Sequence, residues 1–415
     1  MTGDQRLGRT TETFFGWRVT WAAFIVAVFG WGLGFYGPPV YLYAVQEARG
    51  WSLELVSTAV TAHYLIGAVF VANLPALHRR FGLPNVTKAG AASLAVGLLG
   101  WALAQAPSQL FVATILSGAG WAATGPAAIN AMVSPWFQRR RPAALSFAYN
   151  GASVGGIVFS PLLVAAIAAL GFPGAAAAIG LVLVATLWFL SRRYFARTPE
   201  QMGLAPDGDA AGPAVVNPVT AAKPLPGRQL WRDWRFITLA SGMTIGLFAQ
   251  VGVIAHLFSL LVPALGAQLS GVAAGFATFC AIAGRTLVGW LLPRGADRRV
   301  VAAANYAVQT GGCAAFLLAG DTDIMLMLLG VLLIGAGIGN TTSLPPLIAQ
   351  VEFAKVDVPR AVALITATSQ ATYAFAPAAF GVLRAASDAP LLFAAAIAVQ
   401  LVAAGCYLSG RTSTA

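Results

Sequence analysis

Apolar windows of membrane-spanning length recur along the whole chain, and they constrain the fold more than any other feature. About twelve can be counted, each long enough for a helix that crosses a hydrocarbon core of ~30 Å. Barrel strands would give shorter segments of alternating polarity, so the windows predict an all-α membrane protein. The charged fraction of 9% agrees, because soluble domains have about 25%. The predicted spans are 17–43, 53–77, 84–105, 109–133, 142–169, 173–194, 236–262, 268–292, 299–319, 322–350, 360–383 and 389–409.

The basic residues lie almost entirely on one side of this predicted topology. With twelve spans and the N-terminus inside, Arg49 and Arg384 face outward and Arg285 lies within the membrane. The other Lys and Arg residues face the cytoplasm, which is the positive-inside pattern. It predicts a multi-pass inner-membrane protein with cytoplasmic N- and C-termini. It also accounts for the net charge of +11 without a nucleic-acid partner.

The chain divides into two similar halves. Residues 195–234 are rich in Pro, Gly and Ala and read as a cytoplasmic linker between the six-helix halves 1–194 and 235–415. Short matches recur at a nearly constant offset of about 217 residues, which indicates a parallel duplication. The matched pairs include Trp17-Arg18 with Trp234-Arg235, and Gly118-Ala119-Gly120 with Gly335-Ala336-Gly337.

Three further features carry a family resemblance. The stretches WFQRRRPAAL (136–145) and NGASVGG (150–156) resemble a signature of the monocarboxylate and oxalate/formate transporter branch of the major facilitator superfamily. The linker start RTPEQMGLAPDG (197–208) and the arginine in span 268–292 are similar as well. The resemblance implies the major facilitator fold, with twelve transmembrane helices in two pseudo-symmetric halves and a substrate site between them.

Arg285 is the basic residue that cannot be placed near water. It lies in an apolar stretch, nine residues before Arg294, or about 13 Å along a helix. A charge at such a depth costs at least ~2.5–3.5 kcal/mol. All fourteen acidic residues fall in tails, loops or helix ends, so none is buried to offset it and an anionic ligand is expected. The resemblance points the same way, because that family's arginine in this helix binds the substrate carboxylate. The alternative is a structural arginine bonded to carbonyls between helices.

Four other residues are candidates for substrate binding: Asn340, Trp121, Tyr36 and Gln370. The resemblance places an asparagine and an aromatic residue near the ligand in this family. Similar dicarboxylate carriers have a second cation on the helix that contains Gln370, whereas TATSQATYAF in this chain has none, so a monoanion is predicted. Interhelical hydrogen bonds and simple packing are the alternatives for all four.

His63 and His256 are candidates for proton coupling, since imidazole titrates near neutral pH. The alternative for each is a hydrogen bond between helices. The chain departs here from animal monocarboxylate carriers, which pair a lysine in the first helix with an aspartate four residues before the arginine. This chain has no lysine in its first span, and Ala281 occupies the aspartate position. Exchange of two anions would need neither group.

The sequence therefore predicts a secondary active transporter of a small organic monoanion, such as lactate or pyruvate, that works by alternating access. Proton-coupled symport is the expected mode. An exporter or antiporter of anionic or neutral metabolites or drugs is the alternative, and a non-transporting membrane sensor is the third possibility. No ATP-binding motif or catalytic triad spacing occurs, so an enzyme is not expected.

Cys280, Cys313 and Cys406 fall in predicted helices and imply neither a disulfide nor a metal site. A monomer without cofactors is expected, with a small anion, protons and the lipid bilayer as its partners.

Overall fold

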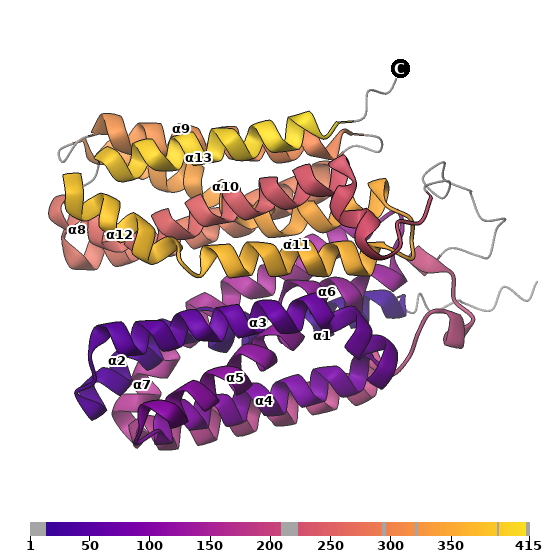
Figure 1. The fold of residues 1–415 in the computed structure, drawn as a ribbon, viewed down its shortest axis with the longest axis horizontal. Helices are drawn as coiled ribbons and strands as arrows, with labels where there is room; N and C mark the ends of the chain where they lie inside the picture. The colour runs from indigo at the N-terminus through magenta and orange to yellow at the C-terminus, as the bar shows by residue number, and fades with distance from the viewer. Residues whose placement is uncertain (1–13, 209–222, 293–295, 320–322, 388–389, 412–415) are drawn as a thin grey trace, which may run out of the picture.

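The computed structural model describes residues 14–208, 223–292, 296–319, 323–387 and 390–411. Its regular elements within these ranges are all helical, and most of them run along one common direction (Figure 1). The N-terminal elements, indigo to magenta in Figure 1, form one bundle, and the C-terminal elements, red to yellow, form a second bundle beside it. This arrangement confirms the predicted all-α class.

Each half contains six helical segments that correspond to the predicted spans. In the N-terminal half these are α1 (Phe15–Gly34) with α2 (Gly37–Arg49), α3 (Leu53–Phe81), α4 (Leu83–Leu103), α5 (Pro107–Thr124) with α6 (Pro126–Val133), and the two arms of α7 (Arg141–Leu190). In the C-terminal half they are the two arms of α8 (Trp234–Leu291), α9 (Arg298–Ala319), α10 (Ile324–Glu352), α11 (Val358–Tyr373) with α12 (Ala376–Ser387), and α13 (Pro390–Ser409).

Three spans predicted as continuous helices are in fact broken. The chain leaves the helix at Phe35–Tyr36, at Gly125 and at Ala374–Phe375, so spans 17–43, 109–133 and 360–383 each form two helices. A proline stands at the first or second position of each helix that follows a break. Proline has no N–H to donate and starts a helix more readily than it continues one, which explains the positions of the breaks.

Two pairs of predicted spans are joined by turns of minimal length. Gly171 has φ 70° between the arms of α7, and Gly266 has φ 72° between the arms of α8. Side chains with a Cβ rarely adopt this left-handed conformation, so glycine permits the reversal at one residue. The other end of the bundle carries the described linker residues 196–208 and 223–233, and we call it the linker end.

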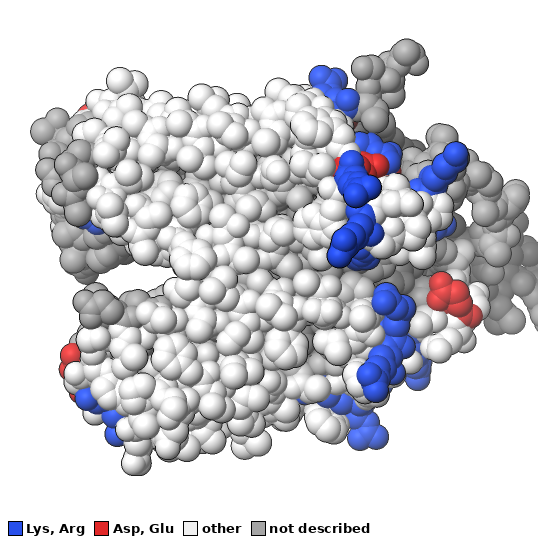
Figure 2. All heavy atoms as spheres, viewed as in Figure 1, with Lys and Arg blue, Asp and Glu red and all other residues white. Residues whose placement is uncertain are grey.

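Polarity is distributed as expected for a protein surrounded by lipid. Large apolar side chains cover the outside, such as Leu181, Leu318 and Met325, which are 72%, 76% and 78% exposed. Nine described helical segments are long and apolar enough to cross a membrane, and the apolar helix Gly275–Leu291 is shorter. Lys and Arg gather at the linker end, and the visible flank of the bundle is almost free of charge (Figure 2). The protein is therefore a multi-pass membrane protein.

The described ends of the linker are tied to one loop in each half. Asp207 accepts hydrogen bonds from the backbone N–H groups of residues 138–140, at 2.6–3.1 Å. Asp357, just before α11, accepts one from the N–H of Leu225 at 2.8 Å. The two loops correspond in the duplicated halves, so the linker is attached at equivalent places.

Candidate functional site

Arg285 lies in the second arm of α8, where the two halves meet. Its side chain is 3% exposed. The guanidinium donates from Nε to the Gly339 carbonyl on α10 at 2.7 Å, and from Nη1 to the Tyr149 carbonyl and to Asn150 Oδ1 (3.2 Å) on α7. One acceptor therefore lies in the C-terminal half and two lie in the N-terminal half.

Small residues allow the close contact of α8 with α10 that brings Gly339 to Arg285. A Cβ on Gly284 would lie 2.2 Å from the Ala336 carbonyl oxygen, and one on Gly339 would lie 2.2 Å from that of Ala281. No side chain fits at either position without moving a helix. Ala281 is thus packed directly against the α10 backbone.

Two further hydrogen bonds connect the halves beside Arg285. Ser146 Oγ donates to the Arg285 carbonyl at 2.9 Å, and Asn150 Nδ2 donates to Thr286 Oγ1 at 2.8 Å. Neither Ser146 nor Asn150 was a candidate from the sequence. Asn150 begins the stretch NGASVGG, and a polar residue at the head of a glycine-rich, membrane-embedded segment was the available signal.

The acceptors around Arg285 are neutral. Arg285 forms no ion pair with a described side chain, whereas Arg235–Asp233, Arg299–Glu352 and Arg411–Asp297 are ion pairs at the linker end. Nη2 of Arg285 makes no hydrogen bond to any described residue, whereas Nε and Nη1 do. The site therefore holds a buried positive charge with no counter-charge among the described side chains and with N–H donors to spare.

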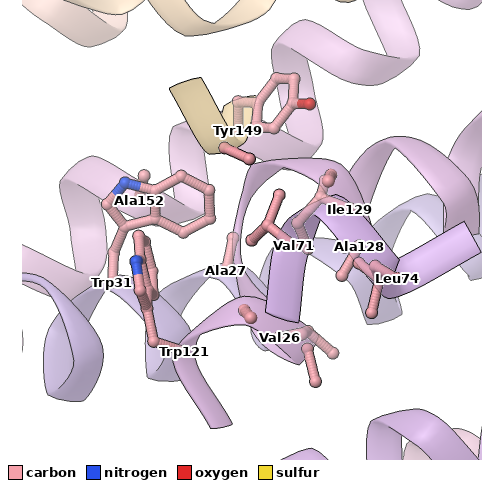
Figure 3. Packing of buried hydrophobic residues seen from close by; sticks show 14 of the residues in the cluster. Val26, Ala27, Trp31, Val71, Leu74, Trp121, Ala128, Ile129, Tyr149 and Ala152 are labelled. Carbon is pink, nitrogen blue, oxygen red and sulfur yellow. The ribbon is translucent and has the colours of Figure 1, made fainter. Parts of the chain in front are cut away.

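An aromatic cluster with one amide lies between the halves. Trp31 contacts Trp121 edge to face, with ring centroids 5.0 Å apart, as Figure 3 shows. Trp121 Nε1 donates across the interface to Gln370 Oε1 at 3.0 Å, and Gln370 Nε2 donates back to the Tyr64 carbonyl at 2.8 Å. Both polar atoms of the Gln370 amide are thus bonded to the other half. Trp31 and Tyr64 are members that the sequence did not single out.

Neither Tyr36 nor Asn340 accepts one of the hydrogen bonds that Arg285 donates. Tyr36 stands at the break between α1 and α2, where a Cβ on Gly156 of α7 would lie 2.6 Å from its ring. Asn340 follows Gly339 in α10, and its Nδ2 makes a long bond of 3.4 Å to the Ala336 carbonyl of its own helix. Its Oδ1 is buried and has no hydrogen-bond partner. The structure gives no bond between Asn340 and Arg285, so a joint role stays a prediction.

The two histidines lie in separate interhelical contacts. His63, 1% exposed, bonds through Nδ1 to Ser117 Oγ at 2.8 Å and donates from Nε2 to the Gly34 carbonyl at 2.9 Å. His256 is half-buried and donates from Nε2 to the Pro377 carbonyl at 3.0 Å. Both are hydrogen bonds between helices, which was the alternative to a role in proton coupling. That role stays a prediction.

Comparison with known proteins identifies the family. The family model of the Major Facilitator Superfamily matches residues 20–377. The chain belongs to the major facilitator superfamily. The crystal structure of a variant of the E. coli fucose:proton symporter is similar, with a TM-score of 0.65 over 94% of this chain and 99% of that one. The sequences are 16% identical, so this likeness concerns the fold alone. The curated proteins that were compared include no match to the sequence.

Membership settles the general class. Proteins of this superfamily are membrane transporters, so this chain is a transporter and not an enzyme. The predicted twelve-helix architecture of two halves is confirmed. The described residues contain no group of three or more His, Cys, Asp or Glu side chains that could hold a metal ion.

Proposed function

We propose that the protein is a secondary transporter of a small organic monoanion and that Arg285 binds the carboxylate of its substrate. The observation that carries the proposal is the buried guanidinium at the junction of the halves, which faces neutral acceptors and keeps Nη2 without a bond to described residues. A carboxylate matches the planar donors of arginine, and the resulting ion pair is stronger in a site without water. A site shared by both halves is also where alternating access requires the ligand to bind.

The neutral surroundings of Arg285 favour a single negative charge on the substrate. Gln370 reaches the interface as an amide whose two polar atoms are already bonded to Trp121 and Tyr64. A second carboxylate would therefore find no cation at that position. Monocarboxylates such as lactate or pyruvate fit this requirement. By the positive-inside rule, we place the protein in the inner membrane, with the linker end and both termini on its cytoplasmic side.

Uptake into proteoliposomes tests the role of Arg285. The purified chain is reconstituted, and uptake of labelled lactate, formate, oxalate and an aromatic acid is measured with and without a pH gradient. We expect saturable uptake of a monocarboxylate, which Arg285→Gln reduces by at least about a hundredfold because a buried charge pair is lost. Stimulation by an inward proton gradient would indicate symport, and dependence on internal anion would indicate exchange.

Two further variants make the result specific. Arg411→Gln removes an arginine that is 50% exposed and paired with Asp297 at the linker end, and it should leave uptake unchanged. Arg285→Lys keeps the charge but loses the planar donors, so it should retain only part of the activity. Thermal unfolding in detergent establishes that each variant is folded. Uptake in Arg285→Gln equal to that of the unaltered protein would contradict the proposal.

A further inference from the structure

A cavity lies between the halves at the linker end. Its volume is about 820 Å³, and both halves line it together with residues of the linker. Five of its lining side chains are basic or imidazole, and Glu200 is the acidic one. The five are His78, Arg79, Arg141, Arg298 and Lys355. A concave surface with this imbalance concentrates small anions.

Two of these arginines come from opposite halves and lack acidic partners. Arg141 begins α7 and donates from Nη2 to the Ser134 carbonyl at 3.0 Å, while its buried Nε has no partner. Arg298 begins α9 and donates from Nη1 to the Leu347 carbonyl. Neither forms a salt bridge with a carboxylate in the described ranges.

The arginine next to Arg298, by contrast, does have an acidic partner. Arg299, the residue after Arg298, is held by Glu352 through two hydrogen bonds of 2.6 and 2.8 Å. Asp207 interacts electrostatically with Arg141, but its carboxylate is already bonded to three backbone N–H groups. The cavity wall also contains two buried atoms without partners, His78 Nε2 and Gln350 Oε1.

This cavity is separate from the site at Arg285. Arg285 bonds to the carbonyls of Tyr149 on α7 and Gly339 on α10. Arg141 lies eight residues before Tyr149, and Leu347, which Arg298 contacts, lies eight residues after Gly339. At 1.5 Å per residue, both helices place the arginine pair about 12 Å nearer the linker end.

We propose that this cavity is a second anion-binding site, a vestibule in which Arg141 of one half and Arg298 of the other hold a small carboxylate. The ligand class rests on the proposed function, and the site itself rests on the unpaired arginines. An anion between them offsets the repulsion of two like charges across the interface. A substrate bound there would lie between Arg285 and the linker end.

Binding of lactate to the full chain in detergent tests the vestibule by calorimetry. Arg285→Gln serves as the background, because it removes the central site and leaves the vestibule. We expect lactate binding to persist in this protein. Adding Arg141→Gln and Arg298→Gln should weaken it by roughly tenfold or more, since two of the charges that concentrate anions are gone.

Charge-matched variants distinguish this site from a general surface effect. Arg192→Gln with Arg193→Gln, also in the Arg285→Gln background, removes two exposed arginines that do not line the cavity and should change affinity little. Arg141→Lys should retain lactate binding. That result would show that the loss of binding in the glutamine variant does not come from misfolding. Equal binding with and without the arginine pair would overturn the vestibule. So would absence of lactate binding in Arg285→Gln, and in that case Arg285-dependent uptake would still support the proposed function.

Discussion

At the scale of single residues, two buried arginines show what distinguishes a structural charge from a ligand-binding one. Arg299 and Arg285 are 2% and 3% exposed. Arg299 is saturated by Glu352, Thr238 and backbone carbonyls, and it stabilises the linker end of the C-terminal half. Arg285 has carbonyl and amide acceptors but no carboxylate among the described residues. Burial of an unpaired charge is strongly unfavourable, so the difference favours a ligand at Arg285.

The sequence located Arg285 because one charge in an apolar window is visible without any structure. Its acceptors were not predictable, because two of them are backbone carbonyls. Every residue has such a carbonyl, and only the contact of α8 with α7 and α10 selects those of Tyr149 and Gly339. The same reason hid Ser146, which bonds to the backbone of Arg285 itself.

We predict that His63 is structural and does not set the pH dependence of transport. Both ring nitrogens are bonded, to Ser117 and to the Gly34 carbonyl, and the ring is 1% exposed. His63→Gln should lower the free energy of unfolding by about 1–2 kcal/mol through loss of these buried bonds. Thermal unfolding measures the loss, and the pH profile of uptake should keep its midpoint.

His256→Gln is the matched comparison, because His256 is half-buried and donates to the Pro377 carbonyl. If a histidine carries the coupled proton, the pH profile of uptake should change in His256→Gln. A shifted or flattened profile in His63→Gln would show that the interpretation of His63 is wrong.

At the scale of helices, the length of each apolar window predicted the position of a membrane span but not the point at which its helix breaks. The breaks at Phe35–Tyr36, Gly125 and Ala374–Phe375 precede a proline in every case, and that signal was present in the sequence. Other prolines, such as Pro75 and Pro345, lie inside continuous helices. Neighbouring helices decide between these outcomes, so proline alone cannot.

We predict that the contact of α8 with α10 depends on Gly284. Its Cβ would meet a backbone oxygen at 2.2 Å, which cannot move without displacing α10. Gly284→Ala should therefore cost about 1–3 kcal/mol of stability by overpacking and should reduce uptake, because Gly339 moves away from Arg285. Thermal unfolding and the uptake assay measure the two effects.

Gly275→Ala on the same helix is the control. A Cβ there has no atom within 4 Å, and the residue is exposed on the outer face, so stability and uptake should be unchanged or slightly improved. Equal behaviour of the two variants would mean that α8 and α10 can separate without consequence.

At the scale of the whole molecule, the duplication visible in the sequence predicted two similar bundles, and this was confirmed. The sequence could not predict which side chains join them, because residues such as Trp121 and Gln370 are 249 positions apart. Their pairing depends on Gly67, where a Cβ would lie 2.3 Å from the Gln370 amide nitrogen. A conformational change that separates the halves here must break this bond.

We predict that Trp121 and Gln370 are energetically coupled across the interface. Trp121→Phe leaves Gln370 Oε1 without its donor, and Gln370→Leu leaves the indole N–H without its acceptor. Each single change should cost about 1 kcal/mol, while the double variant should cost less than the sum because both sides of the Trp121–Gln370 bond are then removed and neither is left unsatisfied. Thermal unfolding of the four proteins gives the coupling energy.

Trp101→Phe combined with Gln370→Leu provides the reference cycle. The Trp101 indole is 1% exposed and donates to Ser117 Oγ within the N-terminal half, so it shares no partner with Gln370. These two changes should therefore add. Additive losses for Trp121 and Gln370 as well would show that their bond does not hold the halves together. Coupling confined to the Trp121 cycle would identify this bond as one that must break and re-form when the halves move against each other.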